Sequence, residues 1–253
     1  VTAEALQASM RLAEELDTTW QIHLSETEEE RQNAIKEFGC SPVEYLAKLG
    51  CLNERTVAVH CVALSDHDIE LLAKSGASVV HCPVSNMRLG CGASPVVKLL
   101  KAGINVALGT DGAASACSLS MFEQMRTAGL IAKGFSQDPT ELTVNQIIRM
   151  ATINGANALK LDREVGSLAV GKLADLAVID MSQLVTMPVL DVLSNVIYAV
   201  EAQCVHQVWV SGSLVANIQQ EKLLRPDRGK LLTKSNIMSW QNRVCEILRD
   251  DFN

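Results

Sequence analysis

Three histidines and one aspartate stand where four predicted strands end, and these residue types could hold a metal ion or transfer a proton. Each follows a short apolar run: His23, His60, His81 and Asp111. In a parallel βα barrel, the catalytic groups lie at the carboxyl ends of the strands and face one common mouth. Imidazole and carboxylate ligands together suit zinc or a similar first-row ion. The pattern therefore predicts a metal centre at one edge of a parallel sheet.

A metal centre of this kind supports hydrolysis. A catalytic ion keeps one coordination position for water and lowers the pKa of that water toward neutrality. The hydroxide so formed needs a base to take its proton and an acid to protonate the leaving group. Glu26 lies three residues after His23, on the loop that leaves the same predicted strand. We expect Glu26 to be that acid.

Each of these residues also has a purely structural interpretation. His23 could be a strand-end histidine with satisfied hydrogen bonds, and Glu26 could be a helix-entry carboxylate that the helix dipole favours. Asp111 lies between Thr110 and Gly112 and could be a turn residue. His81 could pack beneath the rim of the site. The agreement of four strand ends favours the metal centre over these separate interpretations.

The predicted strands alternate with helices, which is typical of a parallel sheet covered on its faces. Thr27 with Glu30 three residues on indicates a helix start, and Gly39 indicates the end of that helix. Four βα units in about 110 residues are half of a (β/α)8 barrel, which typically needs about 250. The predicted strands cover 19–24, 57–61, 78–82 and 104–108, and the predicted helices cover 2–17, 27–39, 41–50, 65–76, 94–103, 118–133 and 143–160.

The pattern changes near residue 161. Turn glycines precede a strand that ends at Asp180, and two further apolar runs flank Gly212 as in a hairpin. These features predict three regions: a partial (β/α)8 barrel at 1–160, a small β domain at 161–220 and a C-terminal helical segment at 221–253. The two remaining histidines are expected to have no chemical role, His67 as a solvated helix-start residue and His206 as a structural residue of the β domain.

Composition excludes several classes of protein. The 253 residues include 22 basic and 29 acidic side chains, a net charge of −7, and the isoelectric point is near 5.3. This balance argues against a nucleic-acid partner, because phosphate binding needs clustered Lys and Arg. No apolar run approaches the ~18 residues of a membrane span. The start, Val1-Thr2-Ala3-Glu4, lacks the basic and apolar regions of a signal peptide.

The cysteines predict a reducing environment rather than a disulfide framework. None of them forms a Cys-x-x-Cys pair, and several lie in apolar runs, so we expect reduced and mostly buried thiols in a cytoplasmic protein rather than zinc-finger ligands. The eight positions are Cys40, Cys51, Cys61, Cys82, Cys91, Cys117, Cys204 and Cys245.

Taken in order along the chain, the strand-end motifs resemble the amidohydrolase superfamily. They look most like the branch that contains the 5′-methylthioadenosine/S-adenosylhomocysteine deaminases and the related chlorohydrolases. The segment from Gly166 to Leu176 resembles the turn into the β-sandwich that such enzymes carry beside a TIM-like barrel. The resemblance covers essentially the whole chain, and its strand-end motifs are Ile22-His23-Leu24-Ser25-Glu26-Thr27, Val59-His60-Cys61, the run from His81 to Gly90, and the run from Gly109 to Ser115.

The resemblance implies a role for each site residue. His23 and Asp111 would be ligands of one divalent ion, most simply zinc, with iron, manganese or nickel as alternatives. Asp111 would also accept a proton from the attacking water. Glu26 would contact and protonate a purine ring nitrogen, and His60 would hydrogen-bond the attacking hydroxide or the tetrahedral centre. His81 is no ligand in the family pattern.

Departures from the family pattern make the chain look like the C-terminal part of a longer enzyme. The family's first barrel strand carries a His-x-His pair that supplies two more ligands, and no His-x-His occurs here. The first four βα units have no counterpart either. A half-barrel leaves open strand edges at 20–24 and 104–108, and such edges invite pairing. We therefore expect a homo-oligomer or a complementing N-terminal half, and weak metal binding by the chain alone.

The expected activity is hydrolytic deamination of an adenosine-type nucleoside, such as 5′-methylthioadenosine or S-adenosylhomocysteine, to the inosine-type product and ammonia. Three alternatives stay open. One is another amidohydrolase chemistry, namely hydrolysis of a chloro- or amino-triazine, and another is a guanine- or cytosine-type deamination. The third is an inactive fragment. Ala116-Cys117 occupies a position where relatives often have asparagines, which leaves the exact substrate open.

Overall fold

The computed structural model describes residues 1–217 and 222–223. The chain divides into two compact units. The first comprises Val1–Ser167 with Leu190–Ala199, and the second comprises Leu168–Val189 with the residues from Val200 onward. The candidate site residues all belong to the first unit.

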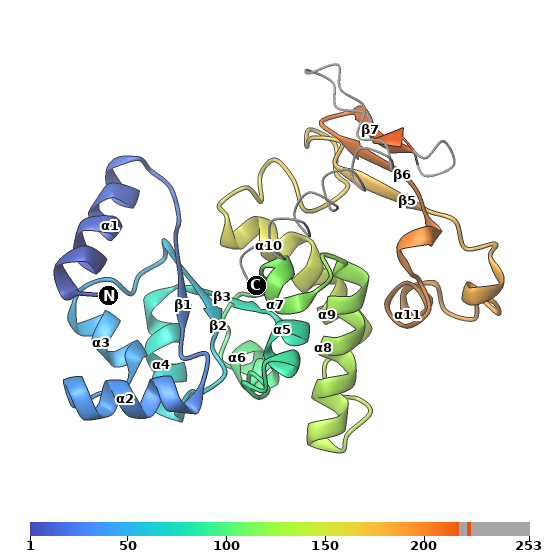
Figure 1. The fold of residues 1–253 in the computed structure, drawn as a ribbon. Coiled ribbons are helices and arrows are strands. Elements are labelled where there is room, and N and C mark those ends of the chain that lie inside the picture. The colour runs from blue at the N-terminus through green and yellow to red at the C-terminus, as the bar shows by residue number, and fades with distance from the viewer. Residues whose placement is uncertain (218–221, 224–253) are drawn as a thin grey trace, which may run out of the picture. The chain divides into compact units, whose positions relative to one another are not determined.

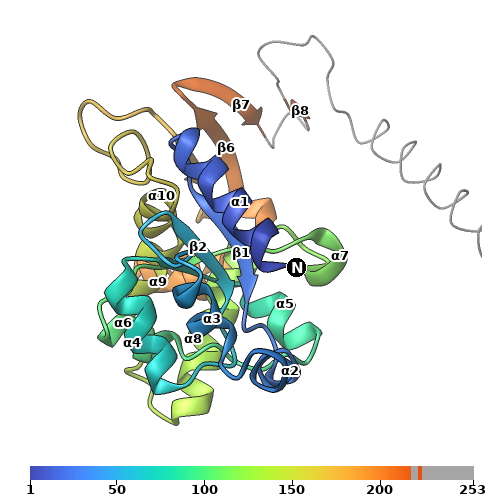
Figure 2. The same ribbon diagram turned by 90° about the vertical axis from the view of Figure 1, so that its left-hand side faces the viewer.

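Four parallel strands form the sheet of the first unit, in the order β1-β2-β3-β4 (Figures 1 and 2). The strands are β1 (Trp20–Leu24), β2 (Thr56–His60), β3 (Ser78–His81) and β4 (Val106–Leu108). All five residues of β2 are buried, as expected for a central strand of a covered parallel sheet. Within this sheet β1 and β4 each have one neighbour, which confirms the two edges predicted from the sequence.

Helices pack against this sheet, and α2 starts at the cap predicted from Thr27 and Glu30. The Thr27 side chain accepts from the Glu30 amide at the start of α2, and Ser41 with Glu44 forms a full capping box on α3. The helices of this unit are α1 (Ala3–Glu15), α2 (Glu28–Phe38), α3 (Pro42–Lys48), α4 (Asp66–Ser75), α5 (Pro83–Arg88), α6 (Val96–Lys101), α7 (Ala113–Ala116), α8 (Met121–Ser136), α9 (Val144–Ala151), α10 (Ile153–Ala158) and α11 (Val192–Tyr198).

Three local predictions are corrected by the structure. The segment after Cys82, where no helix is predicted, forms helix α5, which begins at Pro83. The helix predicted at 143–160 is divided at Thr152, whose hydroxyl donates back to the Ile148 carbonyl at 2.7 Å and competes with the helix hydrogen bonds. The fourth strand begins at Val106 rather than at residue 104.

The core of the first unit lies between the sheet and its helices. Leu72, Leu99, Ile147 and Met150 are each fully buried, and α8, α9 and α10 pack against β4. Burial of side chains of this size stabilises the fold by about 1.5–3 kcal/mol each. The strand ends are therefore held on a rigid support.

An antiparallel sheet forms the second unit, in the order β5-β6-β7-β8. β6 and β7 make the predicted hairpin, and Gly212 at the turn has φ +75°, which a glycine adopts without strain. A second sheet that would complete a sandwich, and the boundaries at 160 and 220, stay predictions. The helical segment predicted at 221–253 lies outside the described residues, apart from β8. The elements are β5 (Leu176–Ile179), β6 (Val205–Val210), β7 (Ser213–Asn217), β8 (Lys222–Leu223) and the 3-10 turns Leu184–Thr186 and Ala202–Cys204.

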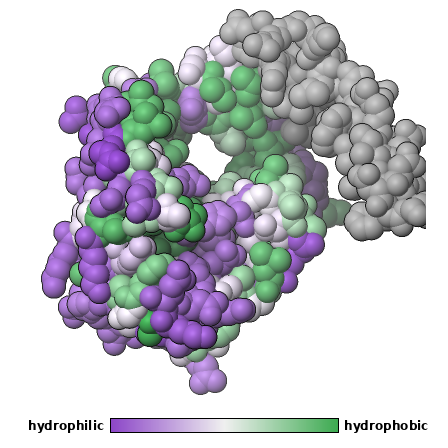
Figure 3. Space-filling view, turned by 60° about the vertical axis from the view of Figure 1, so that its left-hand side comes forward, coloured by the Kyte–Doolittle hydropathy of each residue, from purple (hydrophilic) through white to green (hydrophobic). Residues whose placement is uncertain are grey.

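The described surface mixes polar and apolar side chains. Leu12 on α1 and Leu16 just after it are exposed, and Figure 3 shows hydrophobic residues interspersed with hydrophilic ones on the face it draws. None of the helices in the described part of the chain is long and apolar enough to cross a membrane.

Candidate active site

Three of the predicted residues meet where β1 and β2 end. The His23 and His60 rings contact each other edge to face, with their centres 4.6 Å apart. The Glu26 Oε2 atom lies 4.0 Å from His23 Nδ1 and 3.8 Å from His60 Nε2. One ligand atom from each residue lies within 4.8 Å of the other two. This spacing lets the three side chains converge on a single ligand.

The donor set of this group fits a metal ion. Two imidazoles and a carboxylate are the ligands that zinc and similar ions take in proteins. His60 is fully buried, and its Nε2 atom has no hydrogen-bond partner among the described residues. The His23 side chain is 58% exposed and the Glu26 side chain 25%, so the group opens to solvent on one side. A buried ring nitrogen without a partner, beside an open face, leaves room for a ligand to complete its contacts.

Asp111 lies near His60. It is not part of the group of possible metal ligands that His23, Glu26 and His60 form in the described part of the chain. Its Oδ2 atom accepts a 2.7 Å hydrogen bond from the Ser85 hydroxyl. Burial raises the pKa of the Asp111 carboxyl, but the hydrogen bonds from Ser85, Gly112 and Ser115 and the nearby His60 together hold it below its ordinary value. Asp111 is therefore an ionised carboxylate at neutral pH.

His81 is a buried neutral base next to the site. It is 1% exposed. Burial, and then the neighbouring His60 imidazole, lower the pKa of His81 to about 3. Its Nδ1 atom has no hydrogen-bond partner in the part of the chain that the structure describes. His81 thus carries no charge under physiological conditions.

Left-handed backbone conformations occur at these strand ends. Ser25, His60, Cys61 and Asp111 all have positive φ angles, of 50°, 74°, 49° and 59°. Non-glycine residues rarely adopt this region, and each instance costs on the order of 1–3 kcal/mol. Such strain persists where the surrounding structure fixes the backbone. The backbone therefore turns sharply at, or next to, the candidate site residues.

Sequence reasoning did not identify Glu30 as part of this site. The Thr27–Glu30 spacing predicts a capping box, but the Glu30 carboxylate reaches beyond the cap residue. It accepts from the Ser25 amide at 3.2 Å and from the Glu26 amide at 2.6 Å. Glu30 therefore holds the turn that carries Glu26. Only the capping-box spacing pointed toward this residue.

A second contact missed from the sequence comes from Cys91, which follows α5. Its Sγ atom lies 3.6 Å from Glu26 Oε1. Burial and the nearby Glu26 carboxylate raise the pKa of the Cys91 thiol, so it remains protonated. A single cysteine between two glycines carries no sequence signal for this contact.

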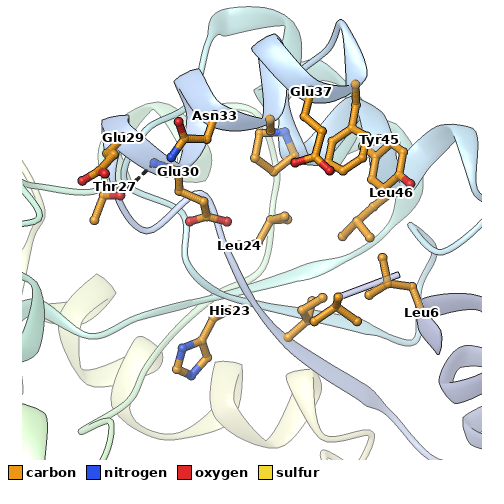
Figure 4. A pocket seen from close by; sticks show the side chains of 15 residues that line it. Leu6, His23, Leu24, Thr27, Glu29, Glu30, Asn33, Glu37, Tyr45 and Leu46 are labelled. Atoms are coloured by element: carbon orange, nitrogen blue, oxygen red, sulfur yellow. Dashed lines mark hydrogen bonds between the residues drawn. The ribbon is translucent and has the colours of Figure 1, made fainter. Parts of the chain in front are cut away.

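A pocket of about 550 Å³ lies beside β1 and is lined by residues of β1 and α1–α3. Figure 4 shows Glu30 and Asn33 of α2 on one side of it and the His23 ring on the opposite side. The pocket borders the edge strand, on which Gln21 and His23 are exposed. The pocket shares His23 with the candidate group, whereas Glu26 and His60 are not among its lining residues.

Comparison with known sequences decides the family. Residues 1–215 match the amidohydrolase family. The chain belongs to the amidohydrolase family. It is 46% identical over 232 residues to a 5-methylthioadenosine/S-adenosylhomocysteine deaminase of Teredinibacter turnerae, covering 92% of this chain and 52% of the relative. It is 38% identical over 232 residues to a 5'-deoxyadenosine deaminase of Methanopyrus kandleri, covering 92% of this chain and 53% of the relative.

The fold of this amidohydrolase chain is similar to that of a solved family structure. An adenosine deaminase from Xanthomonas campestris with bound zinc superposes with a TM-score of 0.89 at 37% identity, covering 97% of this chain and 55% of that one. The chain thus spans about half the length of the relatives it matches. The resemblance inferred from the strand-end motifs is confirmed.

Proposed function

We propose that this chain is the C-terminal part of a metal-dependent aminohydrolase that converts adenosine-type nucleosides to inosine-type products and ammonia. The observation that carries the proposal is the convergence of His23, Glu26 and His60 at two adjacent strand ends. The names of the relatives, deaminases of 5-methylthioadenosine, S-adenosylhomocysteine and 5'-deoxyadenosine, support this substrate class. The first unit would be the second half of a (β/α)8 barrel, and the second unit part of a β-sandwich.

His23 and Asp111 would hold the metal ion together with ligands from another segment. When bound, the ion would lower the pKa of a water molecule. Zinc is the ion we propose, because imidazole and carboxylate suit it and the Xanthomonas campestris structure contains it. The lowered pKa of the Asp111 carboxyl keeps it ionised and ready to accept a proton from the attacking water.

Glu26 would protonate the purine ring nitrogen as water attacks. An amidine carbon is a poor electrophile until the adjacent ring nitrogen is protonated, so this transfer and the attack belong together. The buried His60 Nε2 would hydrogen-bond the oxygen that adds to the carbon. The proton taken up by Asp111 would pass to the amino nitrogen, which departs as ammonia, and the hydroxyl proton would return to Glu26, which leaves the keto purine. Water is thereby consumed and one carbon–nitrogen bond is exchanged for a carbon–oxygen bond.

In this proposal, the remaining metal ligands would come from another polypeptide segment. A partner that supplies a His-x-His strand would complete the ligand set and cover the open edge of β1. A homo-oligomer is the other arrangement that covers this edge. Both arrangements predict that the chain alone has little activity.

The test is ammonia release from 5′-methylthioadenosine by this chain, alone and mixed with the N-terminal half of a full-length relative, with zinc present. We expect ammonia only from the mixture, and loss of at least 10²-fold with Glu26→Gln, which keeps the shape but not the acid. Glu29→Gln, an exposed change three residues further on in α2, is the matched control and should keep the activity. No ammonia from a mixture shown to associate would contradict the proposal. Chloride release from a chlorotriazine without ammonia release would favour the chlorohydrolase alternative.

A further inference from the structure

A fully buried amide contacts the nitrogen of His60 that faces away from Glu26. Asn86 Oδ1 lies 2.8 Å from His60 Nδ1, and both side chains are fully buried. The two residues are 26 positions apart, one at the end of β2 and the other on α5. This contact is independent of the group formed by His23, Glu26 and His60 Nε2.

The partner of Nδ1 determines which nitrogen of His60 carries the proton. A neutral imidazole has one protonated nitrogen, which donates, and one bare nitrogen, which accepts. An amide oxygen only accepts, so the Asn86 contact requires the proton on Nδ1. The bare nitrogen is then Nε2, which is buried without a partner among residues 1–217 and lies 3.8 Å from Glu26 Oε2.

Helix α5 is itself held in place by a buried residue of α8. Gln124 is fully buried, and its Oε1 atom accepts from the Val84 amide at 3.2 Å. The residue before Asn86, Ser85, donates to Asp111 Oδ2 at 2.7 Å. Two consecutive residues of one short helix therefore contact two of the candidate site groups. The position of α5 sets both contacts at once.

We propose that Asn86 is a positioning residue, which fixes His60 in the tautomer with Nδ1 protonated and so presents an unprotonated Nε2 to the site. The role of that nitrogen in deamination rests on the proposed function, but the tautomer is a property of this chain alone. With Nε2 bare, His60 accepts a hydrogen bond from an attacking water or binds a cation. With the other tautomer it would do neither.

The tautomer can be measured by nitrogen-15 NMR of the histidine side chains, since protonated and bare ring nitrogens have distinct shifts and ring couplings. The full chain has five histidines, and His60→Gln assigns the His60 signals by their loss. The protein is first dialysed against a chelator and studied near pH 8.5, above the ordinary histidine pKa of about 6.5. We expect His60 to show protonated Nδ1 and bare Nε2.

Variants of Asn86 separate positioning from simple packing. Asn86→Asp keeps an acceptor in the same shape, so the proton should stay on Nδ1. Asn86→Leu removes the acceptor, and the single Nδ1-protonated form should be lost in favour of a mixture of tautomers. Ser94→Ala is the control, because it removes another buried hydrogen bond, the 2.9 Å bond to the Cys61 carbonyl, without touching Asn86.

The proposal is overturned if wild-type His60 carries its proton on Nε2, or if Asn86→Leu leaves the Nδ1-protonated form unchanged. If Asn86→Leu fails to fold, the wild-type spectrum and Asn86→Asp still decide the question. None of these outcomes depends on ammonia release. A failure of the deaminase assay is therefore distinguishable from a failure of this inference.

Discussion

His60 and His81 lie at the ends of adjacent strands and are both buried, yet their surroundings give them different properties. His60 has Asn86 on one nitrogen and the Glu26 carboxylate near the other. Burial and the neighbouring His60 imidazole lower the pKa of His81 to about 3. At the residue scale, a strand-end position alone therefore does not assign a chemical role.

We expect His81 to make the stability of the chain depend on pH. The unfolded chain binds a proton at this residue below about pH 6.5, whereas the folded chain does so only near pH 3. The contribution of neutral His81 to the free energy of unfolding is therefore complete above about pH 6.5. It is lost progressively as the pH drops from about 6.5 toward 3. At pH 5 the loss from this residue is about 2 kcal/mol.

Urea unfolding of wild type and His81→Gln at pH 7.5 and pH 5 measures this effect. The variant should lose less stability over that interval than wild type, because glutamine does not titrate. His67→Gln, on the exposed start of α4, is the control and should behave like wild type. An unchanged pH dependence in His81→Gln would show that another group is responsible.

Part of the site could be predicted from the sequence at the residue scale. His23, His60 and Asp111 stand out because each follows an apolar run, and Glu26 stands out because of its spacing from His23. The Asn86–His60 contact joins residues on different elements, so no local spacing reveals it. Glu30 was visible as a capping residue, but the turn it holds depends on the left-handed backbone of Ser25.

Helix α5, like α7 and α11, is absent from the helices predicted by the sequence patterns. Its six residues are too few to show a helical period, and Pro83 after Cys82 favours a turn as readily as a helix start. By contrast α2, α3 and α4 carry caps that fix their starts, and these were predicted close to their observed bounds. At this scale, short elements are set by tertiary contacts rather than by local sequence.

Gln124→Leu should loosen α5 without unfolding the chain. The change leaves the Val84 amide without its acceptor, which costs about 1–3 kcal/mol for a buried group. Hydrogen exchange followed by mass spectrometry should show faster exchange in the peptide that contains residues 83–88. The peptide that contains α4 serves as the internal control and should be unchanged. Equal exchange of α5 in wild type and variant would mean that Gln124 does not hold this helix.

At the scale of the whole molecule, the parallel sheet has two edge strands, β1 and β4. β1 has one strand neighbour and borders a pocket of about 550 Å³. The four-stranded parallel sheet was predictable from four alternating βα units. The glycines and apolar runs of the second unit predicted a β region. They did not predict the register shifts between β5 and β6 and between β6 and β7.

We expect the isolated chain to self-associate or to bind a complementing N-terminal half, because an exposed strand edge offers unpaired amides and carbonyls. Sedimentation velocity over a range of concentrations, with and without an equimolar N-terminal half, measures this. The expected result is a concentration-dependent species larger than 27.3 kDa, or a complex in the mixture. A chain that stays monomeric at all concentrations and does not bind the N-terminal half would contradict this prediction.

The most direct test of the metal-centre claim is calorimetric titration of zinc into the chelator-treated chain. We expect weak binding, micromolar or poorer, because the chain supplies only some of the ligands that a closed site needs. His23→Ala should abolish that binding, whereas His67→Ala, an exposed histidine outside the site, should leave it unchanged. Binding that survives His23→Ala, or tight stoichiometric binding by the chain alone, would contradict the account of a metal centre shared between two halves.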